Sequence, residues 1–76
     1  MEELIEFIAQ SLVDDAEAVN THAYSRGDQT IVELEVAAND LGKVIGRQGR
    51  TARAMRTLLS AAGQKTRRRY TLDIVD

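Results

Sequence analysis

Apolar residues recur at helical spacing in two segments of the chain. In the first segment they fall on one face of residues 2–13, and acids cluster near the start, where a helix dipole favours them. A second stripe predicts a helix over about 51–62, with Gly63 as its C-terminal stop. The stripe of the first helix consists of Leu4, Ile5, Ile8 and Leu12, and that of the second of Ala52, Met55, Leu58, Leu59 and Ala62.

Strict alternation of apolar and polar residues marks the strands. Val32, Leu34 and Val36 alternate with Glu33 and Glu35, which is typical of a half-buried strand with one apolar face. This strand, over residues 30–37, forms a hairpin with residues 19–26, and a last strand covers about 68–75. Between them, Asn39-Asp40 is suited to cap a short helix that runs through about Ile45.

The resulting order is α-β-β-α-α-β, which is an α+β class. The hairpin makes strands one and two antiparallel, and a helical crossover makes strands two and three parallel, so the sheet is mixed. Three one-sided helices and three one-sided strands predict two layers, with the helices packed on one face of a three-stranded sheet. We expect residues 1–76 to form a single domain.

The distribution of charge is more informative than the net charge of −2. Residues 1–40 hold one cation and ten acids, whereas residues 41–76 hold nine cations and only two acids. A chain polarised in this way can bind a polyanion with one side, although two solvated faces of opposite sign explain the split equally well. The chain has no Cys, no long apolar run and an acidic start, so we expect a cytoplasmic protein without a membrane segment.

The strongest candidate for chemistry is the segment Gly46-Arg47-Gln48-Gly49, which joins the two later helices. Glycines permit a tight turn and close backbone approach, and the following helix directs free N–H groups and positive potential at the tip. This suits a phosphodiester backbone. Lys43, Arg50 and Arg53 would be nearby phosphate contacts, and Val44 and Ile45 would offer bases an apolar floor. An ordinary helix–helix turn is the alternative reading.

Other functions have weaker support in the sequence. The glycine spacing matches neither dinucleotide-binding nor Walker-type loops, and we expect no enzyme activity, no metal site and no cofactor. His22 is the only histidine, and with three aromatics in the chain, a module that stacks bases on paired aromatics of a sheet is disfavoured. The run Arg67-Arg68-Arg69 fits the solvated start of a strand, with Arg69 paired to Glu33 or Glu35. The alternative is that these arginines extend the surface that would contact the nucleic-acid backbone.

The string from Gly42 to Ala52, within this order of elements, resembles a K-homology (KH) domain of the type II arrangement. The whole chain is similar to the small stand-alone bacterial KH proteins of the KhpA family. The resemblance implies a cytoplasmic single-stranded RNA-binding protein, an RNA chaperone or post-transcriptional regulator. It also implies a larger KH partner of the Jag/KhpB type and a link to cell-wall homeostasis and cell shape. Its RNA-binding residues would be Lys43, Val44, Ile45, Gly46, Arg47, Gln48, Gly49, Arg50 and Arg53.

Two other functions are compatible with the same sequence features. The acidic first helix and exposed sheet face would also suit a protein-interaction module whose KH fold chiefly docks a partner. Phe7, at the edge of the first stripe, fits either the rim of the core or such a contact. A duplex-DNA binder is a third reading, although the first helix of the pair is short for a helix-turn-helix. A homodimer would raise the avidity of a single weak site.

Overall fold

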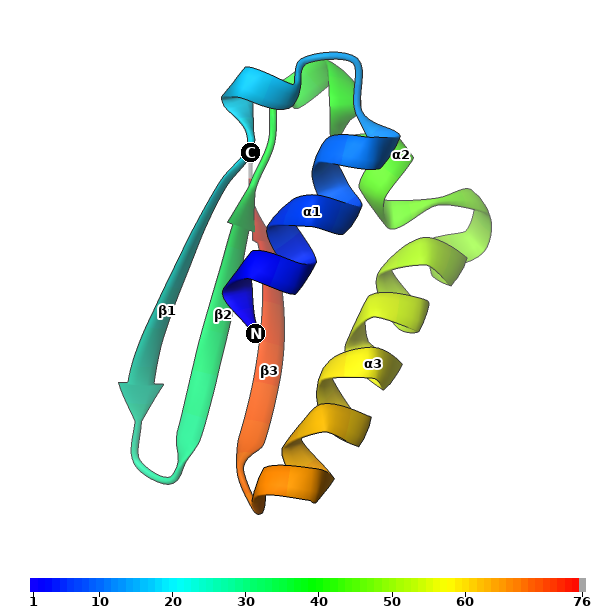
Figure 1. Cartoon of the computed structure of the whole chain (residues 1–76). Coiled ribbons are helices and arrows are strands. Elements are labelled where there is room, and N and C mark those ends of the chain that lie inside the picture. Colours follow the sequence, from blue (N-terminus) through cyan, green and yellow to red (C-terminus); the bar gives the residue numbers. More distant parts are fainter. Residues whose placement is uncertain (76) are drawn as a thin grey trace.

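The computed structural model describes residues 1–75 and contains a three-stranded sheet with helices on one face (Figure 1). This is the predicted α+β KH arrangement. The helices are α1 (Glu2–Leu12), α2 (Leu41–Ile45) and α3 (Arg50–Thr66), and the strands are β1 (Asn20–Arg26), β2 (Gln29–Glu35) and β3 (Arg69–Val75). Three short 3-10 turns join them: η1 (Ala16–Ala18), η2 (Ala38–Asp40) and η3 (Arg47–Gly49).

The sheet has β2 at its centre, antiparallel to β1 and parallel to β3. Val32 of β2 lies opposite Ala23 on one side and Leu72 on the other. Because side chains alternate across a strand, this rank faces the helices, and the neighbouring rank built on Ile31 faces the other way. The mixed sheet therefore follows the prediction, including the parallel pairing of the last two strands.

The core lies between the helices and the inner sheet face. Ile5 of α1, Leu34 of β2 and Met55 of α3 are at most 1% exposed and pack in one cluster. Burial of side chains of this size stabilises a fold by about 1.5–3 kcal/mol each. The sequence predicts Leu58 in the same stripe, but this residue is 47% exposed, because Met55 and Leu59 alone face the sheet from this part of α3.

Helix α3 is longer than the sequence predicts, because Gly63 does not end it. Gly63 is a buried residue inside the helix, and a side chain there would meet the main-chain carbonyl of Arg68 and the ring of Tyr70. Arg67 ends the helix instead, in the left-handed conformation at φ 58°. The N–H of Arg68 then donates to the Gly63 carbonyl over 2.8 Å. The glycine thus serves close packing of α3 against β3 rather than helix termination.

Candidate nucleic-acid interface

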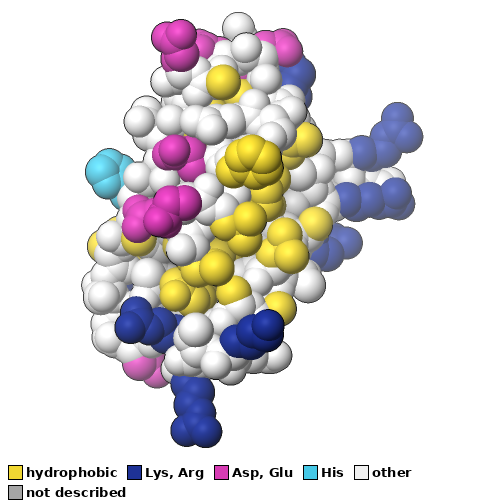
Figure 2. All heavy atoms as spheres, viewed as in Figure 1, with side chains coloured by type: hydrophobic (Ala, Val, Ile, Leu, Met, Phe, Trp, Pro, Cys, Tyr) yellow, Lys and Arg dark blue, Asp and Glu magenta, His cyan; other side chains and the backbone are white. Residues whose placement is uncertain are grey.

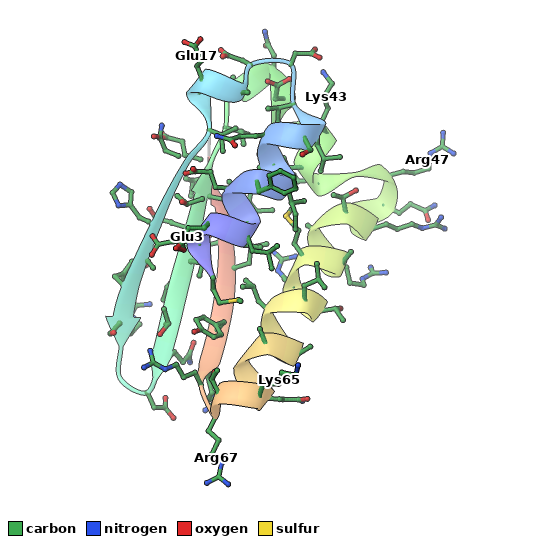
Figure 3. The ribbon with its side chains drawn as sticks, viewed as in Figure 1. Glu3, Glu17, Lys43, Arg47, Lys65 and Arg67 are labelled. Atoms are coloured by element: carbon green, nitrogen blue, oxygen red, sulfur yellow. The ribbon has the colours of Figure 1, made fainter. Side chains whose placement is uncertain are left out.

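The turn between α2 and α3 has a backbone that requires glycine at position 46 and favours it at position 49. Gly46 lies at φ 78° and ψ 170°, a region that is essentially restricted to glycine. Gln48 at φ 56° and Gly49 at φ 74° follow in the left-handed region. The Gly46 N–H donates to the Gly42 carbonyl over 2.8 Å, and the Gly49 N–H donates to the Gly46 carbonyl over 3.0 Å. The chain therefore reverses within four residues, and Arg47 stands at the outermost point (Figure 3).

A close approach within the turn gives Gly46 a second role. A Cβ on Gly46 would lie 2.8 Å from the Thr51 Cβ and 2.9 Å from the Thr51 main-chain nitrogen. A Cβ on Gly49 would have open space around it. The first glycine thus lets the turn fold back on the first residues of α3, whereas the second supplies only backbone freedom. Thr51 is a part of the site that sequence reasoning missed, because nothing local to Gly46 signals this contact.

The structure brings three exposed arginines to the turn and the start of α3. Arg47 projects from the tip, and Arg50 and Arg53 follow on the exposed side of α3. Arg50 donates from Nη2 to Gln48 Oε1 over 3.2 Å, and none of the three forms an ion pair within residues 1–75. Since α3 is a 17-residue helix, its N-terminal dipole adds positive potential at the same place.

Lys43 is placed differently from these arginines, because two carboxylates hold its ammonium group. Its Nζ lies 2.8 Å from Asp14 Oδ2 and 3.3 Å from Asp40 Oδ1. These hydrogen bonds, first to Asp14 and then to Asp40, raise the pKa of Lys43. The expected phosphate contact at Lys43 would therefore require exchange of these partners for a phosphate oxygen.

Asp40 does not cap α2 with its side chain, contrary to prediction. Its carboxylate is 2% exposed and accepts hydrogen bonds from the main-chain N–H groups of Asp14 (3.3 Å) and Asp15 (3.1 Å). The Asp15 N–H is the main cause that lowers the pKa of Asp40; burial opposes it, and the Asp14 N–H and Lys43 support it. Asp40 thus ties the segment after α1 to the start of α2, a long-range contact with no local sequence signal.

Only one of the two residues predicted to offer an apolar surface to bases is exposed. Val44 is fully buried in the core and offers no surface to a base, because α2 packs this side against the molecule. Ile45 is 37% exposed and lies directly before Gly46. Val44 therefore supports the turn from beneath, and Ile45 alone can contact a ligand.

An apolar band separate from the turn lies on the helical face. Figure 2 shows hydrophobic side chains gathered between α1 and α3. Phe7 is 67% exposed, so it is not at the rim of the core, and Leu4 and Leu58 are 38% and 47% exposed. We call Leu4, Phe7 and Leu58 the apolar band.

Residues 1–75 contain no group of His, Asp and Glu side chains with metal-ligand geometry, and no pocket. None of the helices described is long and apolar enough to cross a membrane.

Comparison with known proteins matches nearly the whole chain. The sequence model of a family described as KhpA/KhpB, KH domain matches residues 2–74. A Borreliella burgdorferi protein named RNA-binding protein KhpA is 53% identical over 97% of this chain and 90% of its own length. A protein of the same name from Treponema pallidum is 48% identical over 99% of this chain and 94% of its own length. Another, from Halalkalibacterium halodurans, is 46% identical over the full length of both chains. No solved structure gave a significant match.

Proposed function

The chain belongs to the KhpA/KhpB KH-domain family, and on this premise we propose that it binds single-stranded RNA through the turn Gly46–Gly49. The observation that carries the proposal is the turn itself. Its first glycine has a conformation restricted to glycine, and three exposed arginines, which form no ion pair within residues 1–75, follow it in the turn and the start of α3. Relatives that share 53% and 46% of the sequence are named RNA-binding proteins.

The proposed contact is electrostatic and made with the RNA backbone. Main-chain N–H groups of the turn and the N-terminal dipole of α3 face the phosphates, and Arg47, Arg50 and Arg53 neutralise them. A GxxG clamp of this kind holds about four nucleotides. Ile45 provides the apolar contact beside the turn, and Lys43 joins when a phosphate displaces its carboxylate partners. Selectivity for sequence is weak in such a site because phosphate contacts do not distinguish bases.

The structure suggests a sharp test of the turn. Gln48 and Gly49 are left-handed, a conformation that Asp and Asn tolerate better than most residues, and a Cβ on Gly49 meets no atom. The variant Gln48→Asp/Gly49→Asp therefore adds two negative charges without the collision that Gly46→Asp would cause. Gln48→Asn/Gly49→Asn is its neutral control of almost equal shape.

We expect the Asp variant to lose binding to an oligouridylate of about five nucleotides, and the Asn variant to keep most of it. Fluorescence anisotropy at low salt measures both, with circular dichroism to establish the fold. If both folded variants bound as tightly as the wild type, the turn would not be the RNA site. Stronger binding of a DNA duplex than of single strands in direct competition would favour the duplex-DNA reading.

The cellular role we propose is that of a cytoplasmic RNA chaperone or post-transcriptional regulator without catalytic activity. It acts with a larger KH protein of the Jag/KhpB type and is linked to cell-wall homeostasis and cell shape. Family membership supports this role. A physical reason supports the partnership as well, since a single site of about four nucleotides binds weakly and gains avidity from a second KH domain.

A protein-docking role has its own support in the apolar band. Phe7 in this band is 67% exposed, and contiguous exposed apolar patches mark sites of protein–protein interaction. We assign this surface to the larger KH partner. The variant Phe7→Ser/Leu58→Ser should lose co-purification with that protein while keeping binding to short RNA. A dimeric wild type and a monomeric variant on size exclusion, with the partner still bound, would assign the band to a homodimer instead.

A further inference from the structure

A second cluster of cations lies at the end of α3 opposite to the turn. We call it the basic pole; it comprises Arg26, Lys65, Arg67, Arg68 and Arg69. These residues come from the end of β1, the last turn of α3, the connection of two residues that follows α3, and the start of β3. Helix α3 separates the pole from the turn, and its 17 residues span about 25 Å. Figure 3 shows Arg67 pointing out from the end of the molecule beyond α3, and Arg47 projecting sideways from the turn before α3.

Strand register places two of these arginines on one sheet face. Gln29 of β2 lies opposite Arg26 of β1 and opposite Arg69 of β3. All three side chains belong to the rank that faces away from the helices, because Gln29 is two residues from Ile31 on that face. The arginines therefore flank a neutral residue at a separation of about 10 Å, twice the strand spacing.

The charge of the pole is almost uncompensated. Arg69 forms an ion pair with Asp28 over 3.5 Å, and not with Glu33 or Glu35 as the sequence predicts. The side chains of Arg69 and Asp28 are 71% and 76% exposed, so solvent screens this ion pair strongly. Arg26, Lys65, Arg67 and Arg68 have no ion pair within residues 1–75. The dipole at the C-terminus of α3 accounts for cations on that helix, but not for Arg26 and Arg69 on the sheet.

An aromatic side chain lies beside these arginines. Tyr24 is two residues before Arg26 on β1, so both point to the same sheet face, and Tyr24 is 43% exposed. An exposed ring next to cations is the combination that binds single-stranded nucleic acid, since bases stack on the ring and cations hold the phosphates. The other large apolar side chains with comparable exposure belong to the N-terminal residue and to the helices, not to this face.

We infer that the basic pole and Tyr24 form a second RNA-binding surface, which holds the backbone of a further segment of single-stranded RNA. The inference rests on the proposed function of the turn and extends it. An RNA bound at both ends of α3 would be longer than the few nucleotides that the turn holds. Alternatively, the two sites would bind two separate RNA molecules at once. One small domain would then bring two RNA segments within about 25 Å of each other.

The test compares short and long RNA. The variant Arg26→Gln/Arg69→Gln removes the two sheet arginines, and Arg26→Lys/Arg69→Lys retains their charge. Binding is measured for oligouridylates of about five nucleotides, which one site accommodates, and for oligouridylates several times longer. We expect the Gln variant to bind short RNA like the wild type. For long RNA its affinity should fall, and the salt slope should decrease by about 0.7 for each phosphate that is no longer neutralised. The Lys variant should stay close to the wild type.

Tyr24→Ala should weaken long-RNA binding by about fivefold or more through loss of stacking, whereas Tyr24→Phe should not. Equal losses for short and long RNA in the Gln variant would indicate a general charge effect and overturn the inference. Unchanged binding of long RNA by the Gln variant would also overturn the inference. If the Gln variant lost binding to vesicles of phosphatidylcholine and phosphatidylglycerol but bound RNA like the wild type, the basic pole would be a membrane-binding surface instead. If the proposed function of the turn were wrong, the wild type itself would not bind short RNA, and this result is distinct from the outcomes above.

Discussion

Gly46 and Asp40 show how single residues shape the site beyond what their neighbours in sequence suggest. Gly46 could be predicted as a turn glycine from the motif, but its close approach to Thr51 depends on how α3 begins. Asp40 could be predicted as polar and near a helix start, but its hydrogen bonds to the N–H groups of Asp14 and Asp15 span 26 and 25 residues. Local sequence patterns carry no signal for contacts of that separation.

The two glycines of the turn should respond differently to alanine. Gly49→Ala introduces only left-handed strain, which costs about 1–2 kcal/mol. Gly46→Ala combines a conformation reserved for glycine with a collision with Thr51, so we expect a loss of about 3 kcal/mol. Urea denaturation of both variants measures the difference. Equal losses would mean that Thr51 moves aside without penalty.

Asp40 should make stability depend on acidity. Its folded-state pKa lies below the ordinary value of 3.8, so its carboxylate stabilises the fold above that pH. The contribution is lost as pH falls below 3.8 and through the lowered folded-state pKa. We expect Asp40→Asn to melt at a lower temperature than the wild type at neutral pH, with a gap that closes in acid. A gap that stays constant down to the lowest measurable pH would contradict this role.

At the scale of elements, α3 departs most from prediction. Helical periodicity locates it, but a glycine commonly follows a helix, and this rule wrongly predicts Gly63 as the stop. In the folded chain the absence of a side chain at Gly63 allows β3 to pack closely, and the helix continues to Thr66. The same packing decides which apolar residues are buried, and leaves Leu58 exposed while Leu59 is 1% exposed.

The left-handed residue at the end of α3 can be tested by substitution. Arg67 is left-handed at φ 58°, so Arg67→Gly should stabilise the protein by about 1 kcal/mol. Arg68 is not left-handed, so Arg68→Gly should bring no such gain and serves as the control. Thermal unfolding compares the two. A destabilised Arg67→Gly would show that the arginine side chain contributes more than the strain costs.

At the scale of the whole molecule, the cations form two separate clusters on a body of 34 × 22 × 17 Å. The turn with Arg47 is at one end of α3 and the basic pole at the other, with the apolar band beside α3. The charge split between the two halves of the chain could be read directly from the sequence. The separation of the cations into two clusters requires the length of α3 and the pairing of β1, β2 and β3.

Salt dependence reports how many cations one RNA engages. If Arg47, Arg50 and Arg53 each neutralise one phosphate of a short oligouridylate, the slope of log K against log salt should be about −2, at roughly −0.7 per phosphate. Anisotropy titrations at several salt concentrations give this slope. A slope near zero would exclude a phosphate-based site, and a value well beyond −2 would show that Lys43 leaves its carboxylates to join.

The order of the elements, the one-sided strands and the glycine turn with its arginines could all be predicted from the amino-acid sequence. These properties depend on spacing along the chain, which periodicity and motif report directly. The burial of Val44, the ion pairs of Lys43 with Asp14 and Asp40, and the position of Arg26 and Arg69 on one sheet face became visible only in the folded chain. Those outcomes depend on contacts between residues far apart in sequence, which packing and strand register select.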